Sequence, residues 1–279
     1  MKLVKQTVRH AFLAFLSVVW LIPIIWLVAT SFGVDKGPNI RSFFPSAWTL
    51  ENYRALLYGT DSVSQFPNWF MNTLTIAIFT CIISSSFVLM VAYAMSCMRF
   101  PGRKNMITYG SILTMFPGFL SMIAVYFIMK SLGLTNSNIG LILVYSASSG
   151  LGYLVAKGFF DTVPGSMREA AYIEGASEAV VFTRIVLPLS KPIIVYTVIG
   201  AFLVPWMDFI FANIMLNSGI SSQKTVAVGL YRMVDKVNLN TYFAQFTAGG
   251  VLVSIPISIL FIIMQRFYVE GVTGGSVKG

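Results

Sequence analysis

The chain has 279 residues, of which 56% are hydrophobic and only 10% are charged, and its formal net charge at pH 7 is +9. An average soluble domain carries about 25% charged residues. A soluble fold of this length could not hide so much apolar surface, because residues that face water must supply a polar exterior. The composition therefore excludes a soluble enzyme or a disordered protein. It also argues against a nucleic-acid-binding protein and indicates an integral membrane protein.

The sequence offers little for metal or nucleotide chemistry. It contains one histidine, His10, and two cysteines, Cys81 and Cys97, which share one apolar stretch. On one helix these cysteines would lie about 24 Å apart, too far for a disulfide. The sequence has no Cys/His cluster and no G-x-x-x-x-G-K-[ST] loop. We therefore expect that this chain holds no metal or cofactor and is not itself an enzyme.

Six apolar stretches are long enough to cross a bilayer as helices. About 20 apolar residues span the hydrocarbon core, where each backbone group must be satisfied within the helix. The predicted spans are Ala11–Phe32, Phe70–Met98, Ile107–Met129, Ile139–Phe160, Ile193–Leu216 and Phe246–Phe267. The first is too long for a signal-peptide core and no small-residue cleavage site follows it, so we expect it to be retained. We therefore expect an all-α, six-span protein with one transmembrane domain over residues 1–279.

The lysines and arginines set the expected orientation. Twelve of the 19 fall at one side of the predicted spans, and seven fall at the other. Cytoplasmic loops carry the excess of these residues, so both termini are expected in the cytoplasm. The outer side then receives loops at about 33–69, 130–138 and 217–245.

The connection between the fourth and fifth spans, about residues 161–192, carries the most informative pattern. Ser166 and Glu169 have the spacing of a capping box at the start of a short helix. This helix is expected to run to about Ile173, because Gly175 favours a stop or a sharp turn.

A second helix in this connection is expected from about Ser177 to Val186, before Leu187-Pro188 ends it. The first helix mixes polar and apolar residues on both of its faces, as expected for a helix in a cleft of another protein. Its alanines permit close approach, and its carboxylates can pair with a partner's basic groups. Packing on the chain's own cytoplasmic ends is an equally good interpretation on physical grounds alone.

The same connection resembles the EAA loop of bacterial ATP-binding-cassette (ABC) importer permeases. The resemblance extends over more than 20 positions and is carried by Glu169, Ala170, Ala171, Gly175, Ala176, Phe182, Pro188 and Pro192. The family often has aspartate before the glycine, where this chain has Glu174. In that family the loop forms coupling helices that dock in a groove on the ATPase subunit. The resemblance implies that these residues, with Glu174, couple the chain to an ATPase.

Further motifs are similar to the carbohydrate-uptake branch of that family. They are Trp69-Phe70 with Asn72-Thr73, Pro205-Trp206-Met207-Asp208-Phe209, and the C-terminal run from Gln265 to Gly279. The C-terminal run resembles the second permease of maltose and maltodextrin importers. The resemblance therefore implies a type I ABC importer permease in the bacterial cell membrane, with maltose or maltodextrin-type oligosaccharides as cargo.

The resemblance also implies a set of partners. In such importers a second permease completes the pore, two ATPases drive it, and an external binding protein delivers the sugar. ATP-driven closure of the ATPases moves the coupling helices and opens the spans outward, and hydrolysis resets them. The loop at 217–245 is expected to meet the binding protein, and the tail at about 268–279 to reach between the ATPases. No nucleic-acid partner is expected.

Asp208 is the only acid well inside a predicted span, and a charge in the membrane is costly enough to suggest a function. A carboxylate there could accept hydrogen bonds from sugar hydroxyls, and Trp206 could stack on a sugar ring. The alternative for Asp208 is a buried polar contact to another helix or to the partner permease.

Two alternative functions stay open from the sequence. Within the permease interpretation, the cargo could be another oligosaccharide or glycerol phosphate. A secondary sugar carrier is the alternative from a different class, but it would have no reason for an EAA loop. Such carriers usually have more spans and a coupling-ion site.

Overall fold

The computed structural model describes residues 2–38, 42–59, 63–148 and 152–274. The α-helices are α1 (Lys2–Ser31), α2 (Glu51–Tyr58), α3 (Phe66–Cys97), α4 (Arg103–Thr114), α5 (Gly118–Ser131), α6 (Asn138–Ser148), α7 (Tyr153–Phe160), α8 (Gly165–Ile173), α9 (Glu178–Val181), α10 (Leu187–Leu189), α11 (Lys191–Met207), α12 (Ile210–Met215), α13 (Val226–Met233) and α14 (Leu239–Gly274). The described residues also form a π-helix, η2 (Phe182–Val186), and a 3-10 helix, η3 (Ser221–Gln223). The β-type pairing in these ranges is one isolated bridge, Gly33 with Trp48. The predicted all-α class is confirmed.

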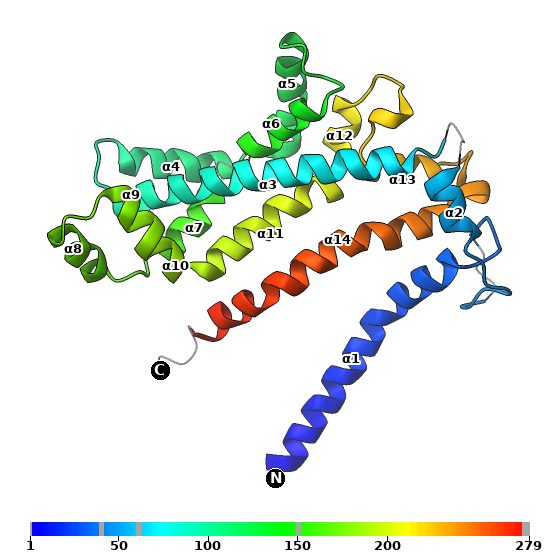
Figure 1. The fold of residues 1–279 in the computed structure, drawn as a ribbon, viewed down its shortest axis with the longest axis horizontal. Helices are drawn as coiled ribbons and strands as arrows, with labels where there is room; N and C mark the ends of the chain where they lie inside the picture. Colours follow the sequence, from blue (N-terminus) through cyan, green and yellow to red (C-terminus); the bar gives the residue numbers. More distant parts are fainter. Residues whose placement is uncertain (1, 39–41, 60–62, 149–151, 275–279) are drawn as a thin grey trace.

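Helices α3, α11 and α14 form the body of the molecule (Figure 1). Helix α11 packs against both α3 and α14, and α14 also packs against α1, which diverges from the body toward its N-terminus (Figure 1). One end of the body carries α2 and α13, and is called the α13 end below. The opposite end carries α8, α9 and α10, and is called the α8 end (Figure 1).

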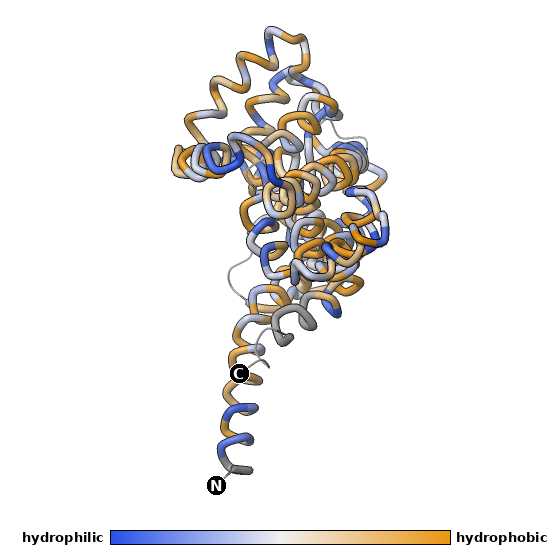
Figure 2. Tube along the Cα trace, turned by 90° about the vertical axis from the view of Figure 1, so that its left-hand side faces the viewer, coloured by the Kyte–Doolittle hydropathy of each residue, from blue (hydrophilic) through white to orange (hydrophobic). Residues whose placement is uncertain are grey.

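Three helices are long and apolar enough to cross a membrane, namely α1, α3 and α14. They correspond to the first, second and sixth predicted spans. Figure 2 shows hydrophobic residues along most of α1, with hydrophilic residues near its N-terminus. Many apolar side chains on α1 stand exposed, as expected for surface that contacts lipid or another membrane subunit.

The other three predicted spans are not single helices. Helices α4 and α5 meet at 101°, because Pro117 has no N–H with which to continue the hydrogen-bond ladder of α4. The fourth span is divided between α6 and α7, on either side of residues 149–151, which lie outside the described ones. The fifth span is interrupted between Met207 and Ile210. Counting each bent helix pair as one span gives up to five in the described ranges, so six spans and cytoplasmic termini stay predictions.

The chain end is more helical than its glycines suggest. Helix α14 runs to Gly274, so the first part of the tail predicted at 268–279 continues a helix. A long helix adds residues without a new nucleation cost, which a free tail would have to meet. Residues 275–279 lie outside the described ones.

Two clusters of buried side chains hold the ends of the body. At the α8 end, α3 and α7 pack on α8, α9 and η2 through Ala92, Tyr93, Tyr153, Phe160, Ala171, Val181 and Val186. At the α13 end, α3 packs on α2, α11, α13 and α14 through Leu56, Phe66, Trp69, Phe202, Trp206, Leu230 and Met233. The loop at 161–192 is therefore part of a packed unit with the last turns of α3.

Candidate functional site

The first helix of the loop at 161–192 begins differently from the prediction. Helix α8 begins at Gly165, with Pro164 as its N-cap residue and no side-chain cap hydrogen bond. The predicted capping box is wrong, because Ser166 lies inside the first turn. Pro164 has an extended backbone (φ −57°, ψ 126°) and its carbonyl accepts from the Met167 N–H at 3.3 Å. The fixed φ of proline suits the residue just before a helix. Helix α8 therefore begins directly after Pro164, one residue before Ser166.

The end of α8 is the predicted one. The helix ends at Ile173, and Gly175 takes a left-handed backbone with a φ of 82°. The Gly175 N–H donates to the Tyr172 carbonyl at 3.0 Å, and the Ala176 N–H donates to the Ala171 carbonyl at 2.9 Å. These two bonds form a Schellman motif, which satisfies carbonyls that a helix end leaves free.

We expect Gly175→Ala to destabilise this turn by about 1–2 kcal/mol, because an L-residue is strained at positive φ. A Cβ at this position would meet no atom within 4 Å, so backbone strain is the sole cost. Gly118→Ala is the matched control, since position 118 is equally open and its φ is not in the left-handed range. Hydrogen exchange of the amides in residues 165–176 measures the effect, and equal exchange in both variants would contradict it.

Helix α8 presents a mixed surface away from the rest of the chain. Ala171 is buried, whereas Ile173 is 87% exposed and Met167 is 44% exposed. Glu169 and Glu174 are exposed as well. Carboxylates beside large exposed apolar side chains are typical of a surface that another protein covers.

The second helix of the loop runs further than predicted. It starts at Glu178, passes through the π-helix η2 and ends only at Leu189, so the predicted end at Leu187-Pro188 is wrong. In a regular α-helix the ring of Pro188 would clash with the carbonyl four residues earlier. The wider π turn before it, in which the Leu187 N–H donates to the Phe182 carbonyl, removes that clash.

The predicted coupling residues divide into two groups. Ala171, Ala176 and Phe182 face the buried cluster of the α8 end. The exposed group consists of Glu169, Ala170, Glu174, Gly175 and Pro188. The sequence predictions thus combined residues that hold the loop to the body with residues that are free to meet a partner.

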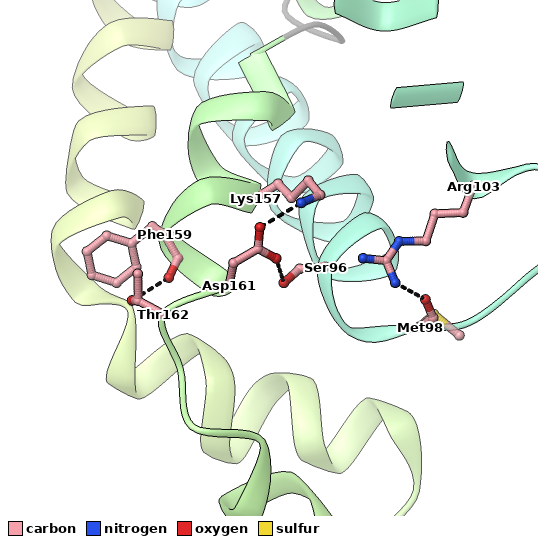
Figure 3. Close-up of polar contacts among 7 residues, drawn as sticks. All are labelled: Ser96, Met98, Arg103, Lys157, Phe159, Asp161 and Thr162. Carbon is pink, nitrogen blue, oxygen red and sulfur yellow. Dashed lines mark hydrogen bonds and ion pairs between the residues drawn. The ribbon is translucent and has the colours of Figure 1, made fainter. Parts of the chain in front are cut away.

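The start of the loop is fixed by a polar cluster between α3 and α7, shown in Figure 3. Lys157 forms an ion pair with Asp161 at 2.6 Å, and the Ser96 hydroxyl donates to the same carboxylate at 2.6 Å. Arg103 donates to the Met98 carbonyl at 3.0 Å and so holds the turn after α3. Burial alone would raise the pKa of Asp161, but the hydrogen bonds from Lys157 and Ser96 hold that pKa below its ordinary value. The carboxylate therefore stays charged at neutral pH.

Asp208 lies at the break between α11 and α12. Its carboxylate accepts from the N–H groups of Phe211 and Ala212, each at 3.1 Å, and from the Tyr145 hydroxyl at 2.6 Å. It therefore caps the first turn of α12, where free N–H groups carry partial positive charge. These contacts match the alternative of a polar contact to another helix.

Trp206 is 5% exposed and packs within the chain. Its ring lies 5.4 Å from that of Phe70 and 6.0 Å from that of Phe202, between ring centroids. Both side chains predicted for the sugar path therefore have partners of their own in this chain. Their contact with sugar stays a prediction.

We expect Asp208→Ala to destabilise the chain by about 1–2 kcal/mol, because two N–H groups of α12 lose their cap. Asp208→Asn keeps one oxygen acceptor and should lose less. The measurements are the half-life of the folded chain in detergent at raised temperature and the KM of sugar uptake. A raised KM with an unchanged half-life, in both variants, would instead place Asp208 in the sugar path.

The motif around Trp69 holds the loop at 217–245 against the start of α3. The Trp69 indole donates to the Ser221 carbonyl at 2.6 Å, and Asn72 donates to the carbonyls of Ser222 and Lys224 at 2.8 and 3.1 Å. The Thr73 hydroxyl accepts a hydrogen bond from the N–H of Val226, the first residue of α13, at 2.8 Å. This motif is therefore a clamp between parts of the chain some 150 residues apart.

Lys224 is almost fully buried beside this clamp, and its ammonium donates to the Leu216 carbonyl. Burial lowers its pKa, with a smaller contribution from the positive charge of Arg232. Lys224 belongs to the loop at 217–245, which the sequence led us to expect at the binding protein. The structure instead gives this part of the loop at 217–245 a buried anchor.

The comparison with protein families gives the identification. Residues 91–274 match the family described as binding-protein-dependent transport system inner membrane component. The chain belongs to this family. The resemblance to ABC importer permeases is thereby confirmed, and so is the predicted place of the chain in the cell membrane.

Relatives of this permease carry sugars. It is 34% identical over 277 residues to the galactooligosaccharides transport system permease protein GanQ of Bacillus subtilis, across 99% of this chain and 96% of that protein. It is 30% identical to the maltodextrin transport system permease protein MdxG of the same organism, across 100% and 98%. It is 32% identical to the maltodextrin transport system permease protein MalD of Streptococcus pneumoniae, across 98% and 96%.

The fold also matches a solved structure. This permease superposes with a TM-score of 0.77 and 21% identity on a chain of a bacterial ABC transporter involved in the import of the acidic polysaccharide alginate. The match covers 95% of this chain and 96% of that one. This permease therefore shares its overall fold with that chain.

Proposed function

We propose that this permease is one of two pore-forming subunits of an ATP-driven, binding-protein-dependent oligosaccharide importer. We further propose that the loop at 161–192 couples it to an ATPase subunit. The observation that carries the coupling role is the exposed surface of α8, where Ile173 and Met167 stand beside the carboxylates of Glu169 and Glu174. In a complex, that surface would place apolar contacts inside a groove and charge-assisted pairs at its edge.

The body of the permease supports this role. Ala171, Val181 and Val186 are buried against the turns of α3 and α7 at the α8 end, so α8 and α9 would not rest on the ATPase alone. A docked ATPase that moves would therefore move helices that also cross the membrane. The account implies two ATPases, a second permease and a binding protein on the outer face.

We propose an oligosaccharide as the cargo, because the relatives named above carry galactooligosaccharides and maltodextrins. Maltodextrin is the narrower proposal, supported by the C-terminal run from Gln265 to Gly279. Membership of a binding-protein-dependent family disfavours the secondary sugar carrier. The described acids all lie outside α1, α3 and α14 up to Phe267, and Asp208, at the break between α11 and α12, already has partners in this chain. A coupling-ion site therefore has little support.

The test is transport by the reconstituted importer in vesicles. The permease, its partner permease, the ATPase and the binding protein are supplied together with maltotriose or β-1,4-galactotriose, with and without ATP. We expect uptake of at least one of these sugars only when ATP and the binding protein are both present. Uptake driven by an ion gradient without ATP would contradict the proposed function.

A further inference from the structure

The last turns of α3 hold both helices of the coupling loop. In α8, Arg168 donates to the Cys97 carbonyl at 3.3 Å. In α9, Glu178 accepts from the Tyr93 hydroxyl at 2.5 Å. At the start of η2, the ring of Phe182 lies 4.9 Å from the ring of Tyr93, between centroids. One short stretch of α3, residues 93–97, therefore contacts α8, α9 and η2.

Tyr93 and Glu178 form the strongest of these contacts. The ring of Tyr93 is 5% exposed, so packing fixes the direction of its hydroxyl. A hydrogen bond from a hydroxyl to a charged carboxylate is shorter and stronger than one between neutral groups. Glu178 is exposed whereas Tyr93 is buried, so the bond lies at the edge of the packed cluster.

Tyr172 of α8 lies beside the same pair of side chains. Burial raises the pKa of Tyr172, the neighbouring Tyr93 hydroxyl lowers it, and the Glu178 carboxylate raises it. Side chains of α3, α8 and α9 therefore meet around Glu178.

Helix α8 has few buried contacts of its own, so its polar contacts with α3 and α9 matter for its position. Helix α8 stands at the far end of the body (Figure 1), and its buried anchor is Ala171. A single small apolar contact leaves a short helix free to rotate about its own axis. The hydrogen bond from Arg168 to α3, and the position of Tyr172 beside Tyr93 and Glu178, restrict that rotation.

We propose that Tyr93 and Glu178 are positioning residues that make α3 follow the coupling loop when the ATPase moves it. This inference rests on the proposed function and adds to it the residues that carry the movement into the membrane. Helix α3 packs against α11 along the body, so a shift at Tyr93 reaches both helices. The link joins a surface helix to a membrane helix through one carboxylate.

The test uses the complete reconstituted importer and measures sugar transported per ATP hydrolysed. Tyr93→Phe keeps the ring on Phe182 and removes the hydroxyl, and Glu178→Ala removes the acceptor. We expect each variant to lower the ratio about tenfold, the loss typical of one charge-assisted hydrogen bond. We expect the double variant to fall no further, because both changes break the same contact.

Matched controls separate positioning from general damage. Tyr109→Phe and Glu51→Gln change exposed residues of the same types, on α4 and α2, and should leave the ratio unchanged. Glu178→Gln keeps an oxygen acceptor and should restore part of the ratio. Wild-type amounts of ATPase subunit should copurify with each variant.

Three outcomes would overturn the inference. One is a ratio within about twofold of wild type in both single variants, while Glu169→Lys removes sugar-stimulated hydrolysis. Another is additive losses in the double variant. The last is a loss of bound ATPase subunit that accounts for the whole effect.

Failure of the proposed function would look different, since neither maltotriose nor β-1,4-galactotriose would then stimulate the wild-type complex. Hydrogen exchange of residues 177–186 in the same complex then tests whether the Tyr93–Glu178 hydrogen bond holds the loop. Faster exchange in Tyr93→Phe than in Tyr109→Phe supports it, and equal exchange overturns it.

Discussion

We expect the charge reversal Glu169→Lys to lower sugar uptake and sugar-stimulated ATP hydrolysis at least about tenfold. Glu169 is exposed on α8, so the substitution leaves the fold of the chain and its insertion in the membrane intact. At a docked interface it would exchange a charge-assisted pair for a like-charge contact, which costs about 2–5 kcal/mol. The measurements are vesicle uptake and the amount of permease in washed membranes.

Glu51→Lys is the control for Glu169→Lys. Glu51 is another exposed glutamate, but it begins α2 at the α13 end, far from the coupling loop. We expect this control to transport at the wild-type rate. Normal uptake by Glu169→Lys itself, with normal membrane insertion, would contradict the coupling role.

We expect Gly229→Ala to produce the largest loss of stability among glycine-to-alanine substitutions in the loop at 217–245. A Cβ at this position in α13 would lie 2.2 Å from Cδ2 of Trp69. The ring of Trp69 cannot move aside, because it is fully buried and its indole donates to Ser221. Overpacking of this kind costs about 1–3 kcal/mol and here also strains the clamp.

Gly158→Ala is the matched control for Gly229→Ala. Gly158 is also inside a helix, α7, but a Cβ there would meet no atom within 4 Å. Replacing an open helical glycine with alanine stabilises by up to about 1 kcal/mol. Half-lives in detergent at raised temperature should therefore move in opposite directions. Equal half-lives would show that the Trp69 ring yields to the added methyl.

Local patterns in the sequence were enough to predict several features. Three of the six predicted apolar stretches form the long helices α1, α3 and α14, as their length and hydropathy predicted. Gly175 marks the end of α8, since its left-handed backbone is a local requirement. The EAA pattern at 161–192 led to the correct family.

Features that depend on distant residues could not be predicted. The break at Asp208 interrupts a stretch whose hydropathy is continuous, and so does the bend at Pro117, although that bend has a local cause that hydropathy does not register. Asp208 looked like an isolated charge in a span, because its partner Tyr145 lies 63 residues away. The link between Tyr93 and Glu178 joins a predicted span to a loop, and no sequence spacing reveals it.

The capping box failed for a local reason. Ser166 and Glu169 had the correct spacing, but Pro164 already supplies the extended residue at which a helix can start. Pro164 and Ser166 each favour a helix start, and they lie within three residues of each other. The helix begins after the first of them. Sequence patterns of this kind locate helix ends to within a residue or two.

Photo-crosslinking from α8 tests the central claim most directly. A photoreactive phenylalanine analogue is placed at Ile173, which is 87% exposed on α8, or at Tyr58, which is 80% exposed on α2. Each permease is irradiated in native membranes, and the adducts are identified by mass spectrometry. The account predicts adducts with an ABC ATPase from position 173 and none from position 58. An absence of ATPase adducts from position 173, in vesicles that still import sugar under an ion gradient without ATP, would contradict it.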